Sequence, residues 1–287
     1  MGYLIMSELE RLTDNFIFLE GPRWRHGQLY VSDMWGKKVY SIDSAGVTTE
    51  LVEIINRPSG IGFMNNGAML VSSMADKKVL IVTDGNKIST FCDLEPFVKG
   101  DINDLVVDAN DNVYVGNFGY DLFAGAKEAP GSICLIKSDG SPSIVADNLA
   151  FPNGMVIDVK NKILICAETF GHKLTAFDLN SDGTLRNERI WAELGDNTPD
   201  GICLDEDGAI WVASFVTEKF IRVLEGGEIQ KEISVKGKKA VACNLGGCDR
   251  KTLYCLTYNG ELEDISKGLP RAEIYTCQVE TAGAGSP

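Results

Sequence analysis

Residues 200–214 read DGICLDEDGAIWVAS, and this stretch decides the fold because the rest of the chain repeats it in altered form. It opens with an acidic residue and a glycine, continues into a short apolar run, and turns through residues 205–208. A second apolar run, 210–212, follows the turn. β-Branched and aromatic residues bounded by turn residues indicate strands, so the stretch predicts two antiparallel strands joined by a tight turn.

The same pattern occurs six times along the chain. Each copy opens with a small polar or acidic residue, usually followed by glycine; the opening residues are Glu20, Ser59, Asn103, Asn153, Asp200 and Asn244. Successive openings are 39 to 50 residues apart, which is the period of propeller blades. Third and weaker fourth strands follow, as at 38–42 and 47–52, and long helical patterns are absent. We therefore predict an all-β fold, a six-bladed β-propeller of four-stranded antiparallel blades.

The two ends of the chain lie outside the six repeats. Residues 15–18 precede the first unit, and we expect this N-terminal strand to supply the outer strand of the last blade and so close the ring. Residues 1–280 are thus predicted to form one propeller domain. The small polar residues of 281–287 predict a flexible C-terminal tail.

Composition limits the partners that we expect. With 27 basic and 41 acidic residues, the net charge is −14, which disfavours nucleic acid and anionic membranes as partners. No apolar run approaches the ~20 residues of a membrane span, and the first eleven residues lack the apolar core of a signal peptide. None of the eight cysteines forms a CxxC pair, so we expect buried thiols and a cytoplasmic protein. We expect the protein to be monomeric or weakly homo-oligomeric.

The six opening residues should ring the central axis at one rim of the propeller. All six carry oxygen and two are carboxylates, a donor set that suits a hard cation. We predict one divalent metal ion, Ca²⁺ as the first choice with Mg²⁺, Mn²⁺ or Zn²⁺ as alternatives, held by Glu20, Asn153 and Asp200. Asn and Asp before glycine are also common turn formers, but six aligned copies favour a shared geometric role.

The second strand of each unit should return to this same rim. It is expected to end 13 to 15 residues after the opening residue, at Asp33, Ser73, Asn117, Glu168, Ser214 and Tyr258. These residues and the loops after them would form a pocket wall, in which lie Trp35, Phe118, Tyr120, Phe170, His172 and Phe215. An aromatic wall above a polar floor suits a small organic substrate, although rim aromatics can also simply pack loops. His172 is a candidate proton shuttle or a structural histidine, whereas His26 falls at the opposite rim.

Several motifs resemble the family of gluconolactonase, senescence marker protein (regucalcin) and luciferin-regenerating enzyme. The segments that carry the resemblance are residues 19–22 (LEGP), 103–104 (ND), 151–155 (FPNGM), 166–172 (CAETFGH) and 199–202 (PDGI). The resemblance implies a six-bladed propeller in which Glu20, Asn153 and Asp200 bind a divalent metal. It also implies that Asn103 helps to hold the metal or the substrate.

One position departs from the family pattern. Sugar-lactonase members often place an arginine two residues before the asparagine that aligns with Asn103, to meet sugar hydroxyls. Here that position is Asp101, which we count with Asn103 and Asn117 among the expected substrate contacts. The departure puts gluconolactone itself in doubt and allows a less polar lactone or another ester.

The resemblance and the ring together predict a metal-dependent lactonase. The metal would polarise the lactone carbonyl, and Asp200, with Glu20 next, would act as general base toward water. No G-x-S-x-G elbow, phosphate loop or dinucleotide fingerprint is present. The alternatives are a metal-binding propeller with a non-hydrolytic or regulatory role, and phosphotriesterase or lyase chemistry on the same scaffold.

Overall fold

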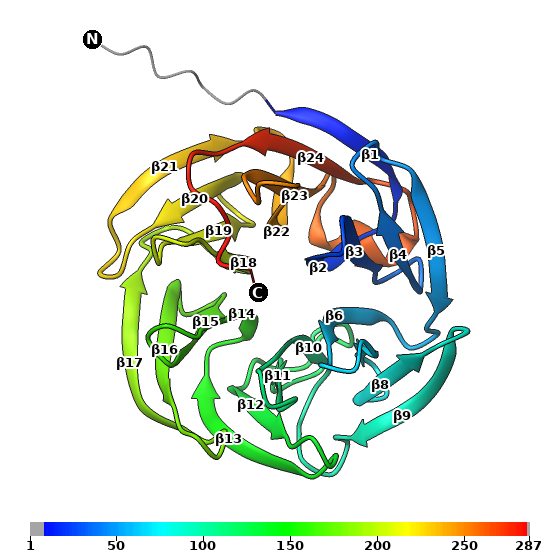
Figure 1. The fold of residues 1–287 in the computed structure, drawn as a ribbon, viewed down its shortest axis with the longest axis vertical. Coiled ribbons are helices and arrows are strands. Elements are labelled where there is room, and N and C mark those ends of the chain that lie inside the picture. Colours follow the sequence, from blue (N-terminus) through cyan, green and yellow to red (C-terminus); the bar gives the residue numbers. More distant parts are fainter. Residues whose placement is uncertain (1–8, 286–287) are drawn as a thin grey trace.

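The computed structural model describes residues 9–285. Six four-stranded antiparallel sheets stand around a central axis, as Figure 1 shows, and this confirms the predicted all-β, six-bladed propeller. Along the chain, turns alternate with apolar strands, as the repeats predicted. No helix among the described residues is long and apolar enough to cross a membrane.

The blades follow one another in chain order. Blade 1 contains β2 (Leu19–Arg25), β3 (Gln28–Asp33), β4 (Lys38–Ile42) and β5 (Thr48–Glu53), and blade 2 contains β6 (Pro58–Phe63), β7 (Met69–Ser73), β8 (Lys78–Thr83) and β9 (Lys87–Asp93). Blade 3 contains β10 (Ile102–Val107), β11 (Val113–Asn117), β12 (Gly131–Ile136) and β13 (Pro142–Leu149), and blade 4 contains β14 (Pro152–Asp158), β15 (Ile163–Glu168), β16 (Lys173–Leu179) and β17 (Leu185–Glu193). Blade 5 contains β18 (Pro199–Leu204), β19 (Ile210–Ser214), β20 (Lys219–Val223) and β21 (Ile229–Ser234).

The last blade joins the two ends of the chain. It combines β22 (Lys239–Gly246), β23 (Thr252–Tyr258) and β24 (Ala272–Gln278) with β1 (Glu10–Phe16), which pairs antiparallel with β24. The N-terminal strand therefore supplies the outer strand of the last blade and closes the ring, as predicted, although it begins at Glu10 and not at residue 15.

The inner strands approach one another closely around the axis. A Cβ on Gly60 would lie 2.3 Å from the backbone nitrogen of Leu105, on the neighbouring inner strand. A Cβ on Gly21, which has φ +56°, would lie 2.5 Å from the carbonyl oxygen of Ser59. The glycines that follow the opening residues therefore serve close strand approach rather than a turn.

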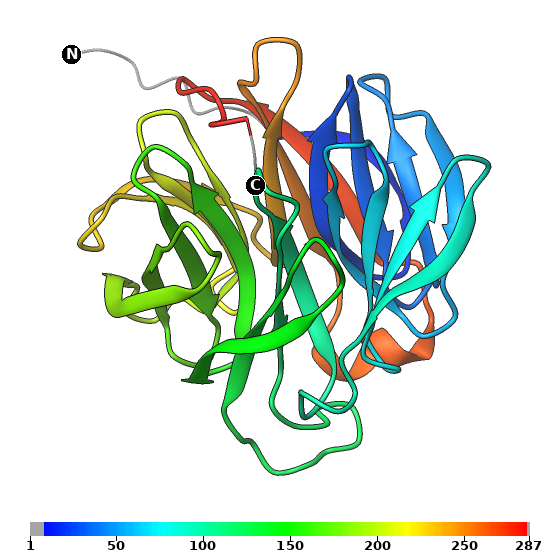
Figure 2. The ribbon, with the colours of Figure 1, turned by 60° about the horizontal axis from the view of Figure 1, so that its bottom comes forward.

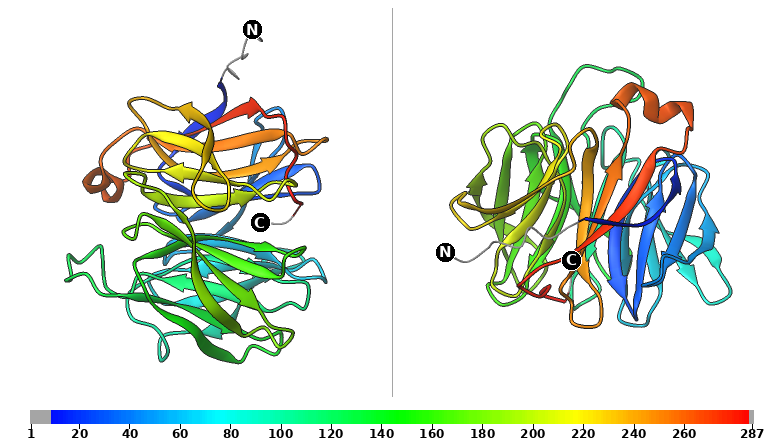
Figure 3. Two further views of the ribbon diagram at one scale, coloured as in Figure 1. Left: turned by 90° about the vertical axis from the view of Figure 1, so that its left-hand side faces the viewer. Right: turned by 90° about the horizontal axis from the view of Figure 1, so that it is seen from above.

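Two segments project from one face of the propeller, which we call the upper face. They are the loop 118–130 and the short 3₁₀-helix η1 (Leu262–Lys267), and Figures 2 and 3 show them on the same side. Every inner strand begins at this face, and every second strand ends there: β3 at Asp33, β7 at Ser73, β11 at Asn117, β15 at Glu168, β19 at Ser214 and β23 at Tyr258. These six ends are the predicted ones.

The end of the chain lies against the opposite, lower face. Gly283 forms a β-bridge with Asp205 and donates its N–H to the carbonyl of Arg250 at 2.8 Å. Ala282 is buried, and its carbonyl accepts a hydrogen bond from the backbone of Glu206. Within the tail expected to be flexible over 281–287, residues 282–284 are therefore held by backbone hydrogen bonds to residues 204–206 and 250; the last two residues lie outside the described part.

All eight cysteines are free, and seven are buried. Cys166, Cys203 and Cys255 lie within strands and are fully covered. Cys248 is the exposed one. The structure thus confirms the interpretation of most of these residues as small core side chains.

Candidate metal and substrate site

The polar ring is formed by the second residue of each of the first five inner strands. These residues are Glu20, Ser59, Asn103, Asn153 and Asp200, and all are buried, with 1–7% of their surface exposed. A β-bulge interrupts the pairing of each inner strand at this level, for example between Pro152 and Met155. Bulges re-aim side chains and occur often beside functional sites. The same irregularity in five blades therefore takes these polar residues out of the regular strand pairing.

The sixth blade differs from the prediction. In β22 the bulge lies between Ala240 and Ala242, which places Ala240, not Asn244, at the level of the ring. Asn244 lies four residues further down the strand, where its Oδ1 accepts a hydrogen bond from the backbone of Trp24 at 3.2 Å. The expectation of six oxygen donors is therefore wrong at this position, because blade 6 carries an alanine there.

Hydrogen bonds join the ring residues of three consecutive blades. Ser59 Oγ donates to Asn103 Oδ1 at 3.1 Å, and Asn103 Nδ2 donates to Asn153 Oδ1 at 3.0 Å. Asn153 Nδ2 in turn donates to Thr169 Oγ1 at 3.2 Å, and that hydroxyl donates to the carbonyl of Pro199 at 2.7 Å. This network fixes the amides of Asn103 and Asn153. Because Asn103 turns its oxygen to Ser59 and its NH₂ to Asn153, it braces the neighbouring amide in this arrangement.

Two buried carboxylates complete the ring. Burial raises the pKa of Glu20 well above its usual value, and the nearby charge of Asp200 adds to the effect. Burial also raises the pKa of Asp200 to about 8, against a hydrogen bond from Asn153 that lowers it. Taking two neighbouring carboxylates out of water is costly unless a positive charge or donors compensate.

One oxygen of this pair has no protein partner. Asp200 Oδ1 is buried and accepts no hydrogen bond from the residues that the structure describes. A buried carboxylate oxygen without a donor, close to the carboxylate of Glu20 and to the amide of Asn153, belongs to a set of oxygen-bearing side chains that fits a hard divalent cation. Glu20, Asn153 and Asp200 therefore suit such an ion. Within residues 9–285 no three His, Cys, Asp or Glu side chains gather as a metal cage, so the amide of Asn153 would have to contribute.

A buried ion pair lies beside the ring. Arg23 Nη2 lies 2.8 Å from Asp104 Oδ1 and also donates to the carbonyl of Leu105 at 2.7 Å. Burial raises the pKa of Asp104, and Arg23 is the main cause that opposes the rise. The charge of Asp104 also contributes to the raised pKa values of Glu20 and Asp200. The spacing of the repeats does not predict this pair, although Asp104 stands where four other copies have glycine.

Aromatic side chains gather on the upper face. Phe118 stacks on Phe151 with ring centroids 4.2 Å apart, and Phe151 contacts Phe170 at 4.7 Å. Trp35 meets Phe123 edge-on at 5.5 Å, and Phe118 lies 6.4 Å from Phe123. Phe118 and Tyr120 are buried with the same cluster. This chain of rings, which we call the aromatic mouth, includes Trp35, Phe118, Tyr120 and Phe170 of the predicted wall and adds Phe123 and Phe151.

Two other wall residues have contacts of their own. Asn117 Nδ2 donates to the carbonyl and the hydroxyl of Ser132, and its Oδ1 accepts from the backbone of Gly119, so the amide shapes the start of the loop 118–130. His172 Nδ1 lies 3.1 Å from the carbonyl of Asn197, in the turn after β15. These contacts are structural, and the substrate roles expected for both residues stay predictions.

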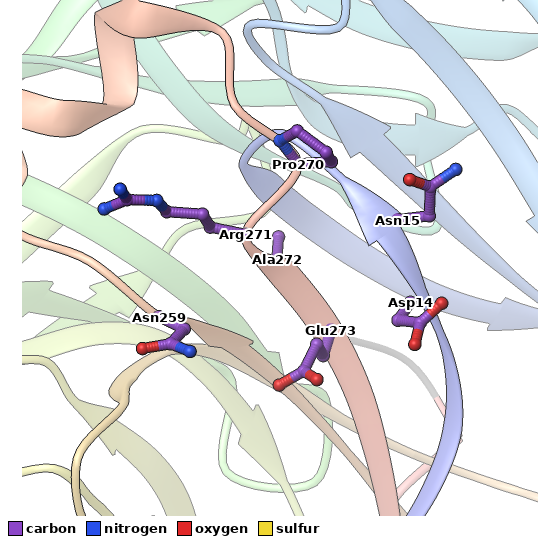
Figure 4. Close-up of a pocket in the computed structure, with 7 residues that line it drawn as sticks. All are labelled: Asp14, Asn15, Asn259, Pro270, Arg271, Ala272 and Glu273. Atoms are coloured by element: carbon purple, nitrogen blue, oxygen red, sulfur yellow. The ribbon is translucent and has the colours of Figure 1, made fainter.

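A separate hollow of about 270 Å³ lies at the edge of blade 6. Asp14, Asn259, Arg271 and Glu273 are among its lining residues (Figure 4). Glu273 accepts a hydrogen bond from Arg11 at 3.3 Å, so the hollow is bordered by surface ion pairs. It contains no ring residue and is distinct from the predicted site.

Fold and site together define a class: a six-bladed propeller with a buried ring of carboxylate and amide side chains at the start of its inner strands. The family model of the SMP-30/gluconolactonase/LRE-like region matches residues 18–259, so this chain belongs to that family. The match spans all six inner strands and confirms the resemblance inferred from the motifs.

Individual relatives are distant. The chain is 25% identical over 284 residues to the "Putative sugar lactone lactonase YvrE" of Bacillus subtilis (strain 168), covering 92% of each protein. The structure of a luciferin-regenerating enzyme superposes with a TM-score of 0.85 at 19% identity, over 98% of each chain. That of a calcium-binding protein, regucalcin, from Agrobacterium tumefaciens strain C58 gives 0.83 at 17% identity, over 98% of this chain and 97% of the other. At such identities the structural matches establish the shared fold.

Proposed function

We propose that this protein is a metal-dependent hydrolase that opens a small lactone, with Ca²⁺ as the first candidate metal. The observation that carries the proposal is the buried pair of carboxylates, Glu20 and Asp200, of which Asp200 Oδ1 lacks a partner among the described residues. The similarity to a protein named as a putative sugar lactone lactonase, and to a calcium-binding regucalcin, is consistent with it.

In this proposal Glu20, Asn153 and Asp200 hold the cation. When bound, the ion polarises the lactone carbonyl and lowers the pKa of a nearby water. The carboxylate of Asp200 would take a proton as the water oxygen bonds to the carbonyl carbon. The C–O bond of the ring then breaks, and that proton passes to the departing alkoxide, which yields the hydroxy acid. Glu20 is the second candidate for the base.

The other residues of the site position these groups. The hydrogen bonds from Asn103 to Asn153 and from Asn153 to Thr169 hold the amide of Asn153 in one orientation. The aromatic mouth offers flat apolar surfaces to the body of a small substrate. Preorganised groups of this kind contribute most to stabilising the charge that develops in the transition state.

A panel of sugar, alkyl and aryl lactones, assayed with and without chelator, tests the proposal. We expect hydrolysis that chelator abolishes and that one of Ca²⁺, Mg²⁺, Mn²⁺ or Zn²⁺ restores. Metal binding without turnover of any lactone would instead support a non-hydrolytic metal-binding propeller. The near-complete burial of the ring residues favours that role as the second candidate.

A further inference from the structure

An arginine from blade 2 lies in the aromatic mouth, next to the ring. Arg57 Nη2 lies 2.6 Å from Asp101 Oδ2, in an ion pair that links the starts of β6 and β10. The same two strands are joined by the hydrogen bond from Ser59 to Asn103. Arg57 and Asp101 each precede their ring residue by two positions, so the ion pair sits one step above the ring.

Two aromatic rings, on two different loops, contact the guanidinium group of Arg57. The guanidinium carbon of Arg57 lies 4.5 Å from the ring centre of Phe123, on the loop 118–130, and 5.2 Å from that of Trp35. Cation–π contacts of this kind are strongest where water is excluded, and only 13% of the Arg57 side chain is exposed. Asp101 and the two rings thus fix the fork in one orientation.

One nitrogen of the Arg57 guanidinium has no acceptor among the described residues. Arg57 Nη1 is buried and donates to no acceptor among residues 9–285, and the same is true of Trp35 Nε1. A buried donor without an acceptor costs free energy that folding alone does not recover. Two such donors in the aromatic mouth, on side chains whose guanidinium carbon and ring centre lie 5.2 Å apart, point to an acceptor that is supplied by a ligand.

We propose that Arg57 determines substrate specificity by donating from Nη1 to a hydroxyl oxygen on the ring of the lactone. This inference rests on the proposed function. Asp101 neutralises the guanidinium, and Asp121 adds negative charge nearby, so an uncharged acceptor suits the position better than an anion. A hydroxyl can also donate to the carboxylate of Asp101, which gives it two partners where an unsubstituted lactone has none.

The test compares two lactones with the same ring, glucono-δ-lactone with hydroxyl groups and δ-valerolactone without. The quantity measured is the ratio of their kcat/KM values, for the wild type and for Arg57→Gln and Arg57→Lys in the metal-loaded protein. We expect Arg57→Gln to lower the ratio about ten- to 150-fold, the range for a lost hydrogen bond to a charged group. Arg189→Gln, on the outer strand β17, is the matched control and should leave the ratio unchanged.

A ratio that both Arg57 variants leave within threefold of the wild-type value would overturn the assignment, even if both activities fall. Calorimetric binding of the non-hydrolysed lactams, gluconolactam and 2-piperidone, separates this result from failure of the proposed function. An Arg57-dependent preference for gluconolactam, without hydrolysis of either lactone, would keep the assignment and reject the hydrolase. Equal binding of the two lactams by the wild type would reject the assignment.

Discussion

Glu20 on β2 and Asp200 on β18 are buried so close together that the charge of one raises the pKa of the other. The two strands belong to blades 1 and 5, separated by the alanine-bearing inner strand of blade 6. The nearby charge of Arg23 lowers the pKa of Glu20 only in part, and Arg23 is itself paired with Asp104. This relationship is the physical reason for proposing a metal ion here, because a divalent cation would offset both desolvated charges at once.

Replacing Asp200 tests its role in the chemical step. We expect Asp200→Asn to lower kcat by about 10²–10³, the usual loss when one preorganised polar group is removed from a transition state, while the fold is kept. The measurement is steady-state hydrolysis of the best lactone, with circular dichroism to verify folding. Asp84→Asn, in the exposed turn between β8 and β9, serves as the control. Near-wild-type turnover by folded Asp200→Asn would remove Asp200 from the mechanism.

Replacing Glu20 tests metal binding without reference to catalysis. Saturating the wild type with Ca²⁺ at about 100 times its Kd should stabilise it by about 2.7 kcal/mol. For a chain of this length that corresponds to roughly 4–5 °C in Tm. In Glu20→Gln we expect most of this shift to disappear, because one of two ligand charges is lost. Differential scanning fluorimetry with and without the ion measures it, and an undiminished shift would place the ion elsewhere.

The hairpin lengths of the fold follow from the sequence. The turn-rich centre of each repeat fixes where the second strand starts, and strand length then fixes where it ends. This is why all six predicted ends, from Asp33 to Tyr258, agree with the structure. For the same reason, the predicted opening residues of five blades all lie at the second position of their inner strands. Blade 6 was aligned wrongly because its ring-level residue, Ala240, is not polar. Asn244, which precedes two glycines and lies lower in the strand, matched the repeat pattern in its place.

The repeat pattern could not predict which side chains contact each other between blades. Arg23 pairs with Asp104, and Arg57 pairs with Asp101, across strands from different blades. Such pairs depend on how closely the blades pack, and that distance is not encoded in the spacing of any single repeat. The one usable signal was local: Asp104 replaces a glycine that four of the other copies keep.

The Arg23–Asp104 pair should be important for stability. Both side chains are buried, so removing one partner leaves an uncompensated charge, and we expect Asp104→Asn to lower the free energy of unfolding by about 3–5 kcal/mol. Arg189→Gln, which breaks the exposed pair with Asp178, should have little effect. Urea unfolding followed by tryptophan fluorescence compares the two. Equal, small effects would show that the buried pair is not coupled to folding.

The close approach of the inner strands can be tested at Gly60. An added Cβ would lie 2.3 Å from Leu105 N and 2.7 Å from the backbone of Asp104, so β6 and β10 would have to move apart. We expect Gly60→Ala to destabilise the protein by more than about 3 kcal/mol. Metal binding should also weaken, because Ser59 on β6 and Asn103 on β10 would move with these strands, and Asn103 holds the amide of Asn153. Gly67→Ala is the matched control, since its turn has open space for a Cβ and only its φ of +89° is strained. If the two variants unfold at the same urea concentration, the spacing of the inner strands does not limit stability, and the ring does not depend on glycine at this position.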